Sequence, residues 1–121
     1  MKGHPIVHLE ISAKDAAAAS RFYHDVFDWK IVVDTNFNYH QFSSEGGPGG
    51  GFVTVPDQAK AGEVVPYINT DDIDASLKKV EKAGGKVLQA KMEIPGVGWF
   101  GTFADPTGNR IGLYTDIKAQ K

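Results

Sequence analysis

The two halves of the chain repeat each other. Asp15 matches Asp72 and Ile31 matches Leu88, and both pairs are separated by 57 residues. In each half a short alternating segment precedes a segment with apolar residues at helical spacing, and three further β-favouring segments follow. Each half is therefore predicted to fold as a β-α-β-β-β unit. One such unit leaves a face of its sheet bare, so two units are expected to pair within a single domain.

Capping residues and apolar spacing predict the two helices. Ser12-Ala13-Lys14-Asp15 has the form of a capping box, and a helix is expected over about 14–27. Thr70-Asp71-Asp72 is expected to cap the second helix, and Lys82 followed by Gly84-Gly85 favours its end. Strands are expected at residues 5–11, 29–34, 38–43, 51–55, 64–69, 86–90, 99–104 and 109–115.

Two polar or glycine-rich segments are expected to connect these elements. Residues 45–51 are rich in glycine, but β-favouring residues follow them instead of a helix N-terminus, so they predict a hairpin connection and not a phosphate loop. Residues 56–62 are predicted to link the two halves. Asp28 follows the first helix, where its side chain tolerates the left-handed conformation less well than glycine would.

Composition limits the classes of partner. The chain has 121 residues, 13 basic against 15 acidic residues and no cysteine. This balance, without a run of like charge, indicates neither a nucleic-acid surface nor a membrane surface, and the absence of cysteine excludes thiol chemistry and disulfides. No apolar run approaches the roughly 18 residues of a membrane helix. We expect a cytoplasmic protein whose partner is a small molecule or another copy of the same chain.

A turn with a clear mechanism lies near the end of the chain. Asp105-Pro106-Thr107-Gly108 has residues that favour a type I turn, with β-favouring segments on both sides. A simple hairpin with a four-residue loop would place Ala104 opposite Asn109. The pairs that follow from this count are Phe103 with Arg110, Gly101 with Gly112, and Trp99 with Tyr114.

The Asp-Pro-x-Gly-Asn turn followed by an alternating strand resembles the closing hairpin of the vicinal oxygen chelate superfamily, which includes glyoxalases, extradiol dioxygenases and bleomycin-resistance proteins. The resemblance implies an α+β fold in which two pseudo-symmetric βαβββ modules form a curved mixed sheet around a cleft, with helices outside. Module one would span about 4–56 and module two about 63–116 of a single domain over 1–121.

The resemblance also implies four inward positions that hold a metal in metal-dependent members. Here they fall at His8, within 51–55, within 64–69, and at Gly112, where such members have a glutamate. Of the residues at these positions only His8 is a strong ligand for a transition metal. We therefore expect neither a metal nor another cofactor.

The predicted ligand site follows from the inward position of Gly112. Residues expected to line it are His8 and Glu10 on the first strand, Tyr67 on the fifth, and Trp99, Phe103, Arg110, Gly112 and Tyr114 on the last hairpin. The third strand contributes either Tyr39 with Gln41 or His40 with Phe42. Structural alternatives stand beside this hypothesis: His8 as a hydrogen-bonded core residue, Arg110 as the ion-pair partner of Glu10, and Trp99 with Phe103 as core.

Three functions are compatible with these residues. The first is a metal-free module that binds a small molecule. The second is a lyase, isomerase or dioxygenase that uses His8 and Glu10 as acid and base, or a metal site that the motif does not reveal. The third is an interaction domain whose pocket has collapsed. Because one fold supports many chemistries, the fold alone does not choose among them.

Overall fold

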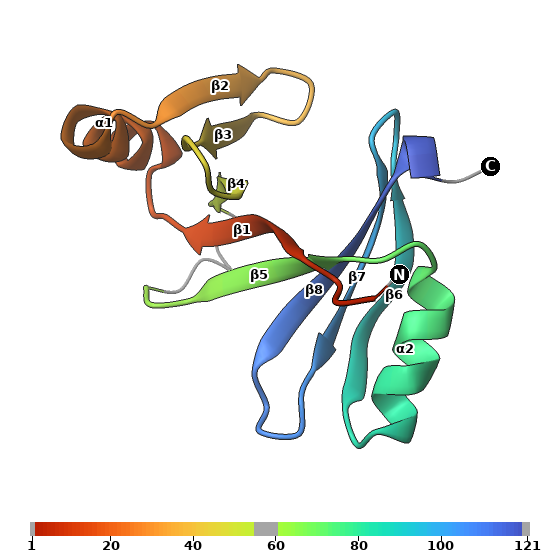
Figure 1. Ribbon diagram of the computed structural model, residues 1–121. Helices are drawn as coiled ribbons and strands as arrows, with labels where there is room; N and C mark the ends of the chain where they lie inside the picture. The colour runs from red at the N-terminus through yellow and green to blue at the C-terminus, as the bar shows by residue number, and fades with distance from the viewer. Residues whose placement is uncertain (1, 55–60, 120–121) are drawn as a thin grey trace. The chain divides into compact units, whose positions relative to one another are not determined.

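The structure is a computed structural model that describes residues 2–54 and 61–119. The chain divides into two compact units, which we call module one (residues 7–65) and module two (residues 1–6 with 66–121). Each contains a four-stranded mixed sheet and one α-helix (Figure 1). The α+β fold and the repeated βαβββ order are as predicted. The predicted linker over 56–62 lies largely outside the described residues.

Module one is built from β1 (Ile6–Ser12), α1 (Ala16–Phe27), β2 (Lys30–Asp34), β3 (Tyr39–Ser43) and β4 (Gly49–Val53). Its strand order is β2-β3-β4-β1, in which β4 is antiparallel to β3 and parallel to β1. Strand β4 therefore begins inside the glycine-rich segment that we predicted as a connection.

Helix α1 begins later than predicted, because Asp15 caps it and Ser12 does not. The Asp15 side chain accepts a hydrogen bond from the Ala18 N–H, which satisfies one of the free donors of the first turn. Ser12 instead ends β1 and donates from Oγ to the Glu63 carbonyl at 3.1 Å. At the other end Asp28 adopts the left-handed conformation with φ 58°.

The core of module one lies between α1 and its sheet. Ala16, Phe42 and Phe52 are buried there, and aromatic rings extend the cluster toward the helix end. The ring of Trp29 stacks on Phe42 at 4.5 Å and on Tyr23 at 4.7 Å between centroids. Phe42 therefore packs on the helix-facing side, and its neighbours Tyr39 and Gln41 occupy positions in β3 that alternate to the opposite face.

Module two continues from β5 (Val64–Asn69), whose first two residues belong to module one, through α2 (Ile73–Lys82), β6 (Lys86–Ile94), β7 (Gly98–Ala104), β8 (Arg110–Asp116) and the short helix η1 (Ile117–Ala119). The strand order is β5-β8-β7-β6, with β5 parallel to β8. Asp72 caps α2 by accepting from the Ala75 N–H. Ile73 and Leu77 of this helix bury their side chains against Leu113.

The predicted turn is confirmed, but the predicted register of the last hairpin is wrong by one residue. The Gly108 N–H bonds to the Asp105 carbonyl, as a type I turn requires, and Gly108 has φ +107°. The Asp105 N–H then bonds to the Asn109 carbonyl. Gly108 therefore acts as an extra residue on the returning side, and Asn109 lies opposite Asp105 instead of Ala104.

This shift moves two predicted site residues to the other face of the sheet. The observed pairs are Ala104 with Arg110, Thr102 with Gly112, and Phe100 with Tyr114. Trp99 and Phe103 pack instead against the cluster of α2. The prediction that they share the face of Gly112 is wrong, because a slip of one residue reverses every side chain of a strand.

Candidate functional site

The face of the module-one sheet opposite α1 collects the polar side chains of three strands. Leu9 and Ile11 of β1 pack toward the helix, so the alternating residues His8 and Glu10 belong to the other face. The register places His8 opposite Gly49 of β4, and both Glu10 and Gln41 opposite Gly51. The imidazole of His8 and the carboxylate of Glu10 therefore each lie beside a glycine of β4, which has no side chain.

Tyr39 uses the space above one of these glycines. A Cβ atom added to Gly51 would collide with Cζ, Oη and Cε1 of the Tyr39 ring. The ring therefore lies directly over the Gly51 backbone. From this position its hydroxyl reaches Nε2 of His8 at 3.0 Å. Of the two open alternatives for the third strand, the structure brings the Tyr39 and Gln41 pair to the face of His8.

Burial and a neighbouring carboxylate keep the His8–Tyr39 pair uncharged. Burial lowers the pKa of His8 below its ordinary value of 6.5. Burial, and then the negative charge of Glu10, raise the pKa of Tyr39 far above its ordinary value. The neutral Tyr39 hydroxyl is thus expected to donate to Nε2 of a neutral imidazole whose proton is on Nδ1.

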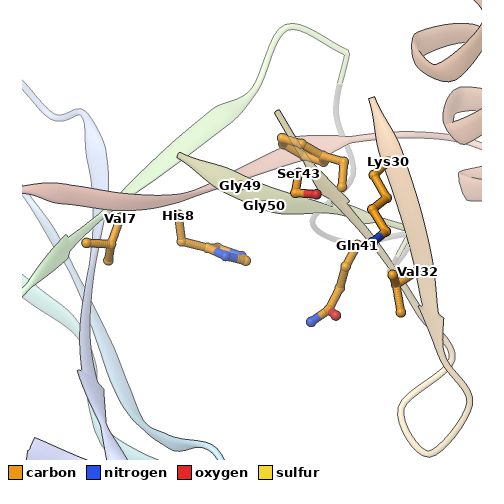
Figure 2. A pocket seen from close by; sticks show the side chains of 9 residues that line it. Val7, His8, Lys30, Val32, Gln41, Ser43, Gly49 and Gly50 are labelled. Atoms are coloured by element: carbon orange, nitrogen blue, oxygen red, sulfur yellow. The ribbon is translucent and has the colours of Figure 1, made fainter. Parts of the chain in front are cut away.

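A hollow of about 230 Å³ lies beside His8 on this module (Figure 2). Figure 2 shows Val7 and His8 on one side and Lys30, Val32 and Gln41 on the other. We call this space the hollow; it is lined by Val7, His8, Lys30, Val32, Gln41, Phe42, Ser43, Gly49 and Gly50. Its volume is below the roughly 300–1,000 Å³ of ordinary ligand pockets, so it suits one end of a small ligand.

The corresponding part of module two is filled by a tyrosine. Tyr67 lies opposite Gly112 and is only 8% exposed. A Cβ atom added to Gly112 would meet the Tyr67 ring, including Cγ at 2.7 Å. Arg110 and Tyr114 are on the same face, and the Tyr114 hydroxyl donates to the Val97 carbonyl at 3.3 Å. Tyr67 and Gly112 are thus in direct contact.

The residues present do not fit the metal that the superfamily resemblance implies. Gly51 lies opposite Glu10, and Gly112 lies opposite Tyr67, which is 57 residues from Glu10, so the two glycines hold equivalent positions in the repeat. Neither offers a ligand, and a tyrosine ring covers each of them. Among residues 2–54 and 61–119, no group of three or more His, Cys, Asp or Glu side chains could hold a metal ion.

The structure therefore distributes the predicted site residues unequally. It gathers His8 and Glu10 with Tyr39 and Gln41 on one face of module one, and Tyr67, Arg110, Gly112 and Tyr114 on one face of module two. Residue-level prediction missed Lys30, Ser43 and Gly49 around the hollow. The alternation of β2 and β3 could have indicated Lys30 and Ser43, since these residues pair with each other.

Comparison with curated proteins gives relatives at about 30% identity. The chain is 32% identical to the anthracycline biosynthesis protein DnrV of Streptomyces peucetius over 88% of its own length and 45% of that protein. It is also 32% identical to a glyoxylase-like domain-containing protein of Didymella fabae, of which it covers 90%. A putative glyoxylase, CFP32 of Mycobacterium bovis, is 29% identical, and the match covers 88% of the chain and 43% of that protein. The chain thus spans less than half the length of DnrV and CFP32.

Solved structures share the fold at low sequence identity. Methylmalonyl-CoA epimerase from Mycobacterium tuberculosis aligns with a TM-score of 0.70 and 15% identity, over 92% of this chain and 87% of the epimerase. A superfamily member from Vibrio splendidus aligns with a TM-score of 0.67 and 15% identity, over 94% of this chain and 99% of that one. None of the helices in the described residues is long and apolar enough to cross a membrane.

A family profile matches most of the chain. The profile described as Glyoxalase/Bleomycin resistance protein/Dioxygenase superfamily matches residues 5–113, which span all of module one and continue through module two to Leu113 in β8. The chain belongs to the glyoxalase/bleomycin resistance protein/dioxygenase superfamily.

Proposed function

We propose that this chain is a small-molecule-binding member of the superfamily that holds its ligand against the His8–Tyr39 pair without a metal. The observation that carries the proposal is that the Tyr39 ring lies on Gly51, within the segment where a metal-dependent member would have a metal ligand, and its hydroxyl is 3.0 Å from His8. A hollow large enough for part of a ligand opens beside the same histidine.

The polar groups of this face suit a ligand that accepts and donates hydrogen bonds. Tyr39 and His8 are neutral near pH 7, and Gln41 adds an amide, so the face offers donors and acceptors that carry no charge of their own. Val7 and Val32 line the hollow with apolar surface. A small molecule with both a polar group and a hydrocarbon part would match this combination.

A thermal melt with a small-molecule library, run with EDTA or with added divalent metals, tests the proposal. We expect ligands that raise the melting temperature equally under both conditions, because binding to the folded state stabilises it by mass action. The stabilisation should be lost in Tyr39→Phe, which keeps the ring on Gly51 and removes the hydroxyl. Tyr23→Phe, which removes a hydroxyl on the helix-facing side of module one, is the matched control. Stabilisation that requires a metal would contradict the proposal.

A second function is favoured by one feature of the same pair. The Glu10 carboxylate could accept a proton from a bound carbon acid, and the neighbouring His8–Tyr39 pair could supply one to the product. The chain would then be an isomerase or lyase. Deuterium exchange at the carbon next to a ligand carbonyl, followed by NMR, would detect this activity, and Tyr39→Phe should abolish it while His24→Gln should not.

We also propose that the protein is cytoplasmic and forms a homodimer. Both expectations come from the superfamily resemblance and the sequence. Measuring the molecular mass of the protein in solution tests the homodimer.

A further inference from the structure

We propose that the hollow binds the carboxylate of the ligand, with Lys30 supplying the positive charge. The inference rests on the proposed function, since it assigns the chemical class of the molecule that this site takes. It concerns residues of β2 and β3 that lie away from the Tyr39 hydroxyl.

The lining of the hollow is rich in donors and lacks carboxylates. Its polar side chains are His8, Lys30, Gln41 and Ser43, and the remaining residues are valine, phenylalanine and glycine. Every one of the four polar side chains can donate a hydrogen bond, and Lys30 carries a full charge. Gln41 and Ser43 can also accept hydrogen bonds, but no carboxylate in the lining would balance the charge of an ammonium.

The strand register places three of these donors in one row across the sheet. Lys30 lies opposite Ser43, and His8 lies opposite Gly49. Neighbouring strands are about 4.8 Å apart, so this row of four strands spans roughly 14 Å from Lys30 to His8. Gly49, the third residue of the row, has no side chain, and it lines the hollow together with Ser43 and His8.

The distribution of charge indicates where the carboxylate would lie. Glu10 is close enough to Tyr39 to raise its pKa, and Glu10 is not among the residues that line the hollow. A negatively charged group would therefore be repelled at the Tyr39 end and attracted toward Lys30. The hydrocarbon part of the ligand would contact Val7 and Val32.

A carboxylate fits this site better than a phosphate. A phosphate carries up to two charges and is usually held by several backbone N–H groups of a helix N-terminus or by bidentate arginines. The hollow has one lysine, no arginine and no helix N-terminus among its lining residues. A single negative charge that shares its oxygens between Lys30 and the neutral donors is the closest match.

Trp29 provides a local reporter for the test. Its ring stacks on Phe42 at 4.5 Å, and Phe42 lines the hollow. The chain has two tryptophans, so Trp99→Phe leaves Trp29 as the only source of tryptophan fluorescence. This variant would be titrated at constant ionic strength with acetate, propionate and butyrate, with the matched amides of these acids, and with inorganic phosphate.

We expect each carboxylate to bind about tenfold more tightly than its amide, because the added charge strengthens the hydrogen bonds from the protein. Lys30→Gln should remove this preference, Lys30→Arg should keep it, and Lys14→Gln, which makes the same charge change just before α1, should leave it unchanged. Because Lys30 is exposed on strand β2, its replacement is expected to leave the fold intact.

The outcomes separate this inference from the function on which it rests. Equal binding of amides and carboxylates, a preference for phosphate, or a carboxylate preference that survives Lys30→Gln would overturn the inference. The absence of any saturable response to the carboxylates would also overturn it. In each case a library ligand that still depends on the Tyr39 hydroxyl would leave the proposed function standing.

Discussion

Replacing Gly112 by alanine tests the contact that distinguishes this chain from metal-dependent relatives. The new Cβ atom would meet three atoms of the Tyr67 ring, including Cγ at 2.7 Å. Cγ is fixed close to the Tyr67 backbone, so a change of side-chain rotamer must move the whole ring and cannot relieve the clash by a small tilt. Tyr67 is only 8% exposed, and its surroundings leave little room for that movement.

The expected cost follows from two opposing terms. Overpacking a filled core typically costs about 1–3 kcal/mol. A glycine in a conformation that alanine can adopt gains roughly 0.4–1 kcal/mol on substitution, because the unfolded chain loses freedom. Gly112 lacks a positive φ, so this gain applies. We therefore expect Gly112→Ala to destabilise the protein by about 1–2 kcal/mol.

Urea unfolding of four proteins would measure the effect: the wild type, Gly112→Ala, Tyr67→Ala and the double variant. In the Tyr67→Ala background the clash is absent, and Gly112→Ala should become neutral or stabilising by roughly 0.4–1 kcal/mol. This change of sign is the signature of the ring over the glycine. If Gly112→Ala stabilises the wild-type protein as well, Tyr67 does not occupy the space above Gly112 and the reasoning is refuted.

Four further predictions concern other parts of the chain. Trp99→Ala should lower the free energy of unfolding by roughly 2 kcal/mol, because this partly buried ring packs on the α2 cluster, and it should leave ligand binding in module one unchanged. Stability should fall as the pH drops below about 6.5, because the unfolded chain binds a proton at His8 more readily than the folded one does, and His8→Gln should flatten this part of the profile. Elemental analysis after purification without chelators should find no stoichiometric metal, whereas one equivalent that is lost in His8→Ala would favour a metal enzyme. Light scattering should give twice the chain mass of 13.1 kDa, and a monomer at micromolar concentration would contradict the dimer.

The sequence was sufficient for the order of elements because the signals for them are local. The cap at Asp72 and the apolar spacing of α2 depend only on residues a few positions apart. The structure has both the cap and the helix where the sequence predicts them. The repeat at 57 residues adds a second, independent sign of the same layout. The start of α1 was harder to predict, since Ser12 and Asp15 are both suitable capping residues and only the extent of β1 decides between them.

The faces of the last hairpin were not predictable by counting from the turn alone. The residues Asp105 to Gly108 form the expected turn, but the Asp105 carboxylate also accepts hydrogen bonds from the backbone of Thr107, Gly108 and Asn109. These bonds hold a loop of five residues instead of four, and they lower the pKa of Asp105. A single additional loop residue was enough to put Thr102 in place of Gly101 opposite Gly112 and to move Trp99 to the face of α2.

Glycine in a strand poses a similar problem for prediction. Residues 49–51 have low β propensity, and they read as a loop when only their own sequence is considered. In the structure each of them makes room for a neighbour: a Cβ atom on Gly50 would collide with the Leu9 carbonyl, and one on Gly51 with Tyr39. These glycines are required by residues of neighbouring strands, and the sequence of residues 49–51 alone does not reveal those contacts.

The two modules use equivalent glycines in different ways. Tyr39 reaches Gly51 from β3, whereas Tyr67 reaches Gly112 from β5, the strand that corresponds to β1. In module one the position that corresponds to Tyr67 is Glu10, so a carboxylate stands beside the tyrosine and histidine instead of a second ring. Module one therefore combines groups that can bind and exchange protons, while module two uses the same place for packing. It follows that Gly51→Ala, which displaces the far end of a ring, should impair ligand binding more than stability, and Gly112→Ala should do the reverse.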